Sequence, residues 1–171
     1  KYLEEYSNVS EDEARNYFEK NKNDYKQIRA SHILISNYDS NNKEVSDDKK
    51  EENKKTAEEV LKLALDGEDF ATLAKEYSDD SSASKGGDLG YFTQDEMVSA
   101  FSKAAFSLKT GEIYNKVVET SSGYHIIKKT GEKDQDFDDV KDDLIKTLES
   151  TKQSTLMQDL YTKYDVQIKN Q

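Results

Sequence analysis

The chain has 171 residues, which corresponds to about one domain with room for a short appendage. Its formal net charge of −11 comes from 36 acidic and 25 basic residues spread along the whole sequence, and cysteine is absent. Nucleic acids and anionic lipids are therefore poor partners, and disulfides, thiol catalysis and thiolate metal sites are excluded. No apolar run approaches the roughly 20 residues of a membrane span, and the start at Lys1 without a signal peptide predicts a processed or trimmed chain.

The first two predicted elements are a helix over 10–27 and a strand over 28–35. Ser10 and Glu13 have the spacing of a capping box at the start of the helix. Helical periodicity gives this helix one broad face, which carries Ala14, Tyr17, Phe18 and Tyr25. Strand alternation places Ile28, Ala30, His32 and Leu34 on one side and Ser31, Ile33 and Ile35 on the other.

The next stretch, 36–53, is polar with mixed charge, which predicts a solvated loop or a frayed helix start. Helices are predicted over 54–66, ending at Gly67, and over 69–77. The first of these helices turns inward Ala57, Val60, Leu61, Ala64 and Leu65. Residues 78–90 are rich in Ser, Asp and Gly, and they predict a long irregular segment whose glycines allow positive φ.

Thr93 and Glu96 again have capping-box spacing, which predicts the start of another helix. Two strands are predicted over 116–120 and 124–129, and a long amphipathic helix over 137–163 precedes a strand-like tail at 166–168. The alternating pattern of 28–130 indicates an α+β sheet domain. Because neither amphipathic flank can bury its apolar stripe alone, we expect the two flanks to pack on each other or on chain outside this sequence.

The two histidines, His32 and His125, are the main candidates for chemistry, although a lone histidine on a strand is more often structural. Both are expected on strands of one small sheet, and each has small hydroxyl residues nearby that could orient the imidazole. These are Ser31 for the first and Thr120, Ser121 and Ser122 for the second.

Two further features have a structural and a functional interpretation. The run Asp79-Asp80-Ser81-Ser82 could bind a metal, but without a third carboxylate at ligand spacing a capping acid is the better interpretation. Four apolar residues would on average belong to a core, but their place beside the glycine-rich segment suits the lining of a pocket. They are Leu89, Phe92, Met97 and Phe101.

The ordered segments of 28–130 resemble the parvulin family of peptidyl-prolyl cis/trans isomerases. The matching segments are RASHILI (29–35), TAEEVLKLALDGEDFATLAKEYSDD (56–80), SKGGDLGYF (84–92), MVSAFSKAAFSLKTGEI (97–113) and VVETSSGYHIIKK (117–129). The flanks are similar to bacterial extracytoplasmic foldase lipoproteins of the PrsA type, in which the parvulin domain is inserted in a helical chaperone domain. The resemblance implies a parvulin domain at 28–130, a small antiparallel sheet wrapped by helices, between flanks 1–27 and 131–171 of the chaperone domain.

Carried over by position, the resemblance implies a set of site residues. The paired histidines of the family are His32 and His125, and Asp80 occupies a position that is cysteine in some parvulins. Thr120 and Ser122 match the hydroxyls of the histidine network. The pocket for the substrate proline ring is matched by Leu89, Met97 and Phe101, backed by Phe92. Acidic residues interleave with the lysines of 36–53, so we expect no Arg clamp and no requirement for phosphoserine before proline.

The implied function is prolyl isomerisation that assists the folding of exported proteins, without metal or other cofactor. The alternative is a holdase-type chaperone whose parvulin domain binds peptide with little turnover; a purely structural or adhesion module does not explain the histidine and pocket residues. The implied partners are unfolded or partly folded exported proteins with X-Pro bonds. The implied location is the outer face of the bacterial cell membrane, through a lipid anchor outside this chain. The apolar stripes of the flanks are compatible with a homodimer.

Overall fold

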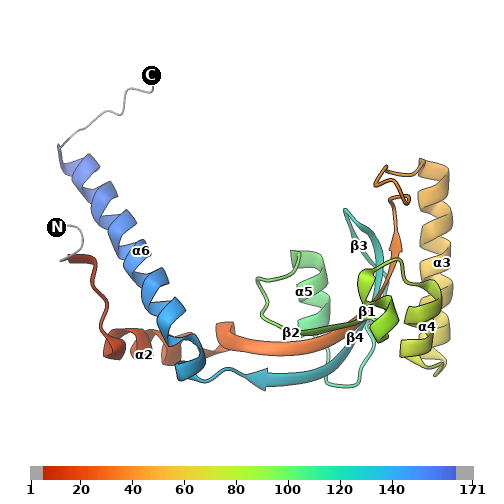
Figure 1. Ribbon diagram of the computed structural model, residues 1–171, viewed down its shortest axis with the longest axis horizontal. Coiled ribbons are helices and arrows are strands. Elements are labelled where there is room, and N and C mark those ends of the chain that lie inside the picture. The colour runs from red at the N-terminus through yellow and green to blue at the C-terminus, as the bar shows by residue number, and fades with distance from the viewer. Residues whose placement is uncertain (1–5, 165–171) are drawn as a thin grey trace. The chain divides into compact units, whose positions relative to one another are not determined.

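A four-stranded antiparallel sheet organises Lys26–Asp134 in the computed structural model, which describes residues 6–164 of the chain (Figure 1). The strand order is β2-β1-β4-β3, with bounds Lys26–Ser36 for β1, Asp88–Phe92 for β2, Val118–Thr120 for β3 and Gly123–Asp134 for β4. The predicted α+β class is confirmed. The long strands β1 and β4 pair at the centre, so residues 93 positions apart in sequence become neighbours.

Each face of the sheet has its own core. Helices α3 (Asp47–Leu65) and α4 (Phe70–Tyr77) pack on the face that carries Ile33 and Ile126. Helix α5 (Ser99–Phe106) packs on the other face, over Ile28 and Ile127. The alternation predicted for the first strand is confirmed, because Ile28 and Ala30 enter one cluster whereas Ile33 and Ile35 enter the other.

Several features of this unit differ from the prediction, and β4, which continues to Asp134 rather than ending at 129, is one of them. Helix α3 begins at Asp47 rather than 54, because the Ser46 side chain accepts from the Lys49 amide and two acids follow in the first turn. Its last residue, Leu65, is 51% exposed and not inward as predicted. Helix α5 begins at Ser99 rather than 93, because the amide of Thr93 donates to the Glu96 carboxylate within a separate turn. The segment 78–90 is not wholly irregular: it contains the 3₁₀ helix η2 (Ser81–Lys85) and the start of β2.

The two ends of the chain form a second compact unit from α2 (Glu11–Lys20), the 3₁₀ helix η1 (Lys22–Tyr25) and α6 (Phe137–Tyr164). The predicted packing of the flanks on each other is confirmed by one cluster that contains Val9, Ala14, Phe18, Phe137 and Leu144. Ser10 caps α2 as predicted, but this helix ends seven residues before the predicted 27, and Tyr17 is 43% exposed rather than packed. The tail predicted at 166–168 lies outside the described residues. Among residues 6–164, no helix combines the length and apolar character needed to cross a bilayer.

Candidate active site

The two histidines meet on one face of the sheet. In the antiparallel register of β1 and β4, His32 lies opposite Ile127 and His125 lies opposite Leu34, so the two imidazoles are diagonal neighbours. Their Nδ1 atoms are 3.1 Å apart and their rings stack with centroids 5.4 Å apart. Both residues are buried. Strand pairing alone therefore brings together two titratable groups from distant parts of the chain.

The donors and acceptors around this pair define one direction of hydrogen bonding. Thr120 Oγ1 lies 2.8 Å from His125 Nε2 and already accepts from the backbone N–H of Ser122. This favours a Thr120 hydroxyl that donates to His125 Nε2. His125 then donates from Nδ1 to His32 Nδ1, and His32 carries its proton on Nε2. That nitrogen is 3.3 Å from Asp80 Oδ2, within ion-pair distance but without the alignment of a hydrogen bond.

Burial keeps both imidazoles neutral near pH 7. It lowers the pKa of His125 to about 4, with the neighbouring His32 acting in the same direction. Burial also lowers the pKa of His32, although the Asp80 carboxylate opposes this shift. For Asp80 itself, partial burial raises the pKa, but the two hydrogen bonds that Ser82 donates, together with the smaller influence of the nearby His32, outweigh it, and the pKa is lowered. The site thus holds one carboxylate beside two uncharged rings.

Asp80 is held in place by the turn that follows α4. Its Oδ2 accepts from the Ser82 amide at 2.8 Å and from the Ser82 hydroxyl at 2.5 Å. These bonds cap η2, so the interpretation of the Asp-Asp-Ser-Ser run as a capping segment is confirmed. Among the described residues, no group of three or more His, Asp or Glu side chains is placed to hold a metal ion.

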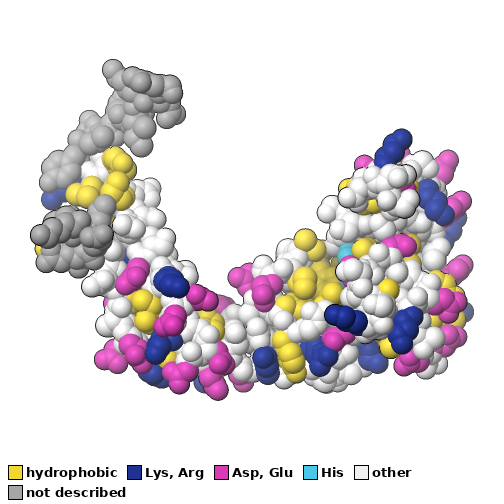
Figure 2. Space-filling view, in the orientation of Figure 1, with side chains coloured by type: hydrophobic (Ala, Val, Ile, Leu, Met, Phe, Trp, Pro, Cys, Tyr) yellow, Lys and Arg dark blue, Asp and Glu magenta, His cyan; other side chains and the backbone are white. Residues whose placement is uncertain are grey.

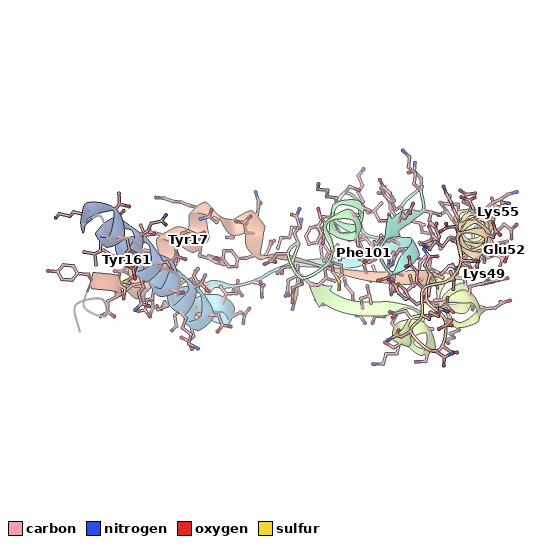
Figure 3. The ribbon with its side chains drawn as sticks, turned by 90° about the horizontal axis from the view of Figure 1, so that it is seen from above. Tyr17, Lys49, Glu52, Lys55, Phe101 and Tyr161 are labelled. Carbon is pink, nitrogen blue, oxygen red and sulfur yellow. The ribbon has the colours of Figure 1, made fainter. Side chains whose placement is uncertain are left out.

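An apolar wall adjoins the histidine pair. The ring of Phe101 lies edge-on to both imidazoles, with centroids 5.6 Å from each. Figure 3 shows Phe101 between α5 and the strands. The ring of Phe92 contacts that of Phe101, with centroids 6.2 Å apart. Leu89 and Met97 are partly buried against the same cluster. Figure 2 shows hydrophobic side chains exposed in a hollow next to α5, with a histidine at its margin.

Two hydroxyl residues singled out from the sequence lie elsewhere. Ser31 follows strand alternation to the face opposite His32, and among the described contacts its hydroxyl makes no hydrogen bond to the ring, so its predicted orienting role is wrong. Ser122 is exposed and reaches the network through its backbone N–H, which donates to Thr120. The other residues inferred from the resemblance, His32, Asp80, Thr120, His125 and the four apolar side chains, lie together at this site.

The structure adds supporting residues that the sequence did not indicate. Gly87, with φ of 78°, accepts from the His32 amide through its carbonyl and passes so close that a Cβ would lie 2.1 Å from the His32 carbonyl oxygen. Ser78 and Asp79 bond the backbone of β1 at Leu34 and Ser36. The segment before η2 therefore continues the edge of the sheet without a strand-like sequence. The only signal for this close approach was the Gly86-Gly87 pair.

Comparison with known proteins is consistent with this geometry. Residues 16–133 match the PPIC-type PPIase domain family. The foldase protein PrsA of Bacillus subtilis strain 168 is 53% identical over 118 residues, which cover 68% of this chain and 34% of that protein. The foldase protein PrsA of Caldanaerobacter subterraneus is 39% identical over 165 residues, covering 94% of this chain and 48% of that protein.

Among solved structures, the crystal structure of the peptidylprolyl isomerase PrsA from Bacillus anthracis is 33% identical with a TM-score of 0.56, covering 99% of this chain and 70% of that one. The chain spans about half or less of the length of the two foldases above. The resemblance to parvulins is confirmed by the match over most of the chain. This protein belongs to the family of PPIC-type peptidyl-prolyl isomerase domains.

Proposed function

We propose that the Lys26–Asp134 unit accelerates cis/trans isomerisation of X-Pro bonds in exported proteins. The observation that carries the proposal is the pair of buried, neutral imidazoles, 3.1 Å apart at Nδ1, directly against the apolar wall around Phe101. Such a wall suits a pyrrolidine ring, and the polar atoms beside it suit the amide bond that precedes the ring. The parvulin domain of this proposal corresponds to residues 28–130.

The reaction needs little chemistry from the protein. Rotation about the C–N bond has a barrier of about 18–20 kcal/mol because the twisted amide loses its resonance. No bond breaks, so neither a nucleophile nor a metal is required. A thousandfold acceleration requires about 4 kcal/mol of preferential binding to the twisted amide. An apolar environment contributes to this preference because the twisted amide is less polar than the planar one.

Each residue of the site has a role in this mechanism. Leu89, Met97 and Phe101, with Phe92 behind them, hold the proline ring so that rotation occurs on its other side. A series of hydrogen bonds runs from the Ser122 backbone N–H through Thr120 and His125 to His32. It fixes the direction of the dipoles that face the substrate amide. Asp80 places a negative charge next to His32, which disfavours a planar amide whose carbonyl oxygen points toward it.

The site does not require a phosphorylated substrate. A phosphate would need Lys or Arg side chains free to form bidentate contacts. In the segment that follows β1, Lys50 is bound by Glu44 at 2.7 Å and Asp47 at 3.5 Å, and Lys49 is bound by Glu52 at 2.9 Å on the outer side of α3 (Figure 3). The segment 36–53 has no arginine, and two of its three lysines are paired with acids of the same segment, so it offers no bidentate clamp for a phosphoserine before the proline.

The unit built from both chain ends supplies the other part of the proposal. Its helices α2 and α6 belong to a chaperone domain that holds unfolded or partly folded exported proteins. The location is the outer face of the bacterial cell membrane, through a lipid anchor. The support is the similarity over 94% of this chain to a protein named as a foldase. The clients are chains with X-Pro bonds, and the apolar faces of the helices leave room for a homodimer.

The test is exchange NMR on an unphosphorylated Ala-Pro peptide with catalytic amounts of the protein. We expect cis-to-trans exchange to rise in proportion to protein concentration. Phe101→Ala should abolish the acceleration, because it removes the wall against both imidazoles. Suppressed aggregation of an unfolded client without any acceleration would overturn the proposal in favour of a peptide-binding chaperone.

A further inference from the structure

The carboxylate of Asp80 has no strongly basic partner in the site. Among the ion pairs of residues 6–164, its only partner is His32, and burial keeps that imidazole neutral near pH 7. The Asp80 side chain is 27% exposed, so solvent screens its charge only in part. Asp80 therefore offers the substrate a negative charge that no ion pair among the described residues neutralises.

The nearest arginine does not supply the missing charge. Arg29 lies on the same strand as His32, but its guanidinium binds Asp88 through two hydrogen bonds, at 3.0 and 2.5 Å. This forked pair neutralises Asp88 and leaves Asp80 to the site. The neighbouring carboxylate of Asp79 accepts from the Ser36 amide at the end of β1, so among the described contacts Asp80 is the only carboxylate beside the histidine pair. In the segment that follows β1, Lys50 is already paired with Glu44 and Asp47.

The geometry indicates which part of a substrate meets this charge. The rotating bond joins residue X to the proline ring, so a ring seated against Phe101 leaves X on the polar side of the site. The Phe101 and His32 rings are 5.6 Å apart, and His32 Nε2 is 3.3 Å from Asp80. One extended residue covers roughly 3.5 Å. The long side chain of a Lys or Arg at position X spans the rest of the distance from the proline ring at Phe101 to the Asp80 carboxylate.

We propose that Asp80 is a specificity-determining residue that favours peptides with Lys or Arg immediately before the proline. This inference rests on the proposed isomerase function and deepens it by naming a substrate class. Attraction between two unit charges near a surface is modest. The expected preference in kcat/KM for Lys or Arg over Glu at position X is therefore roughly fivefold to tenfold rather than absolute. Because the charge is partly exposed, the preference should weaken with salt.

The experiment measures kcat/KM for three peptides, Ala-Arg-Pro, Ala-Leu-Pro and Ala-Glu-Pro, each normalised to its uncatalysed rate. We expect the ratio of Arg to Glu to be roughly tenfold at low salt and to approach one at high salt. The variant Asp80→Asn keeps an acceptor for the Ser82 amide and should bring the ratio close to one. The matched control Glu58→Gln removes the same charge from α3, which packs on the opposite face of the sheet, and should leave the ratio unchanged.

The outcomes separate the two claims. Acceleration of no peptide, including the neutral one, overturns the isomerase function and this inference with it. Acceleration of the neutral peptide with an Arg-to-Glu ratio of one or less overturns the inference alone, as does a ratio that Asp80→Asn leaves intact. If the Asn variant is inactive, the salt dependence of the wild-type ratio decides: a ratio that does not fall with salt contradicts a Coulombic preference.

Discussion

At the histidine pair, the single proton between the two rings constrains the tautomers that the site can adopt. Two Nδ1 atoms 3.1 Å apart share one proton, so each ring's tautomer determines that of the other. The determining contact is Thr120, because its oxygen accepts from the Ser122 amide and its hydroxyl proton is then available to His125. A hydroxyl outside the wall thus sets the dipole that faces the substrate.

Replacing the Thr120 hydroxyl should therefore reduce catalysis without reshaping the wall. Thr120→Val is similar in shape and leaves His125 Nε2 without its donor, and we expect kcat/KM on an Ala-Pro peptide to fall roughly tenfold. Thr120→Ser keeps the hydroxyl and should retain most of the activity. Imidazole ¹⁵N shifts should change in the Val variant only. Equal activities of the Val and Ser variants would remove Thr120 from the mechanism.

The low pKa of His125 predicts a dependence of stability on pH. An unfolded histidine titrates near 6.5, whereas burial lowers the pKa of His125 to about 4 in the folded protein. The unfolded chain therefore binds the proton more readily between these values. The resulting stabilisation is complete above pH 6.5 and is lost as the pH falls toward 4, by roughly 3 kcal/mol in the free energy of unfolding.

Urea unfolding at several pH values measures this effect. His125→Gln removes the group, so its free energy of unfolding should fall less between pH 6.5 and 4 than that of the wild type. His32 has the same direction of shift and accounts for a remaining slope in the variant. Parallel curves for the two proteins would contradict the buried, neutral state of His125.

The candidate site was predictable to different degrees at this scale. The pairing of His32 and His125 was implied by the resemblance to parvulins, and the structure brings the two rings together. Strand alternation alone could not predict it, because alternation assigns faces only within one strand, and the register of β1 on β4 decides which faces match. The role predicted for Ser31, orienting the His32 ring, was wrong because adjacent residues of a strand point to opposite faces. A capping acid was expected in the run from Asp79 to Ser82, but the sequence did not show that Asp80 caps through Ser82, because that contact depends on the fold of a turn without strand or helix period.

At the scale of elements, the backbone beside β1 should tolerate substitution unequally. Gly87 and Gly90 both have positive φ, at 78° and 73°. A Cβ at Gly87 would lie 2.1 Å from the His32 carbonyl oxygen, whereas one at Gly90 would meet nothing within 4 Å. Gly90→Ala should therefore cost only the strain of its φ, about 1 kcal/mol, and Gly87→Ala about 3 kcal/mol or more, because backbone must move.

Chemical denaturation of the two alanine variants checks this difference, and both carry the same change of side chain. Displacement of β1 at His32 should also reduce kcat/KM in the Gly87 variant, because the imidazole pair depends on the strand register. If the two variants were equally stable, close backbone approach at Gly87 would not be a constraint on the fold.

The errors in element boundaries have a common physical cause. Strong side-chain acceptors favour a helix start, but capping-box spacing does not show whether the helix begins there. At Ser46 the cap was hidden in a run of mixed charge, and at Thr93 the same spacing closes a turn that precedes α5. Strand β2 was missed because two glycines precede it and a third interrupts it, which removes the alternating pattern.

At the scale of the whole molecule, the chain contains separate cores that do not follow the order of the sequence. The unit of α2 and α6 joins residues from both ends around Phe18, and the Lys26–Asp134 unit buries its own residues on both faces of the sheet. Each hydrophobic cluster is formed by residues of one unit only. We therefore expect the units to open separately, with different free energies.

Two cavity-forming variants test this independence. Phe18 is 2% exposed in the first unit and Leu73 is 2% exposed in the second. Phe18→Ala should lower the opening free energy of amides in α6 by about 3–5 kcal/mol, and Leu73→Ala that of amides in β4 by about 2–5 kcal/mol. Native-state hydrogen exchange followed by NMR measures both. Because the imidazole pair lies wholly in the second unit, Phe18→Ala should leave kcat/KM on a short Ala-Pro peptide unchanged. Equal loss of protection in α6 and β4 from either variant would instead show one cooperative structure, in which strands β1 and β4 transmit unfolding between the two cores.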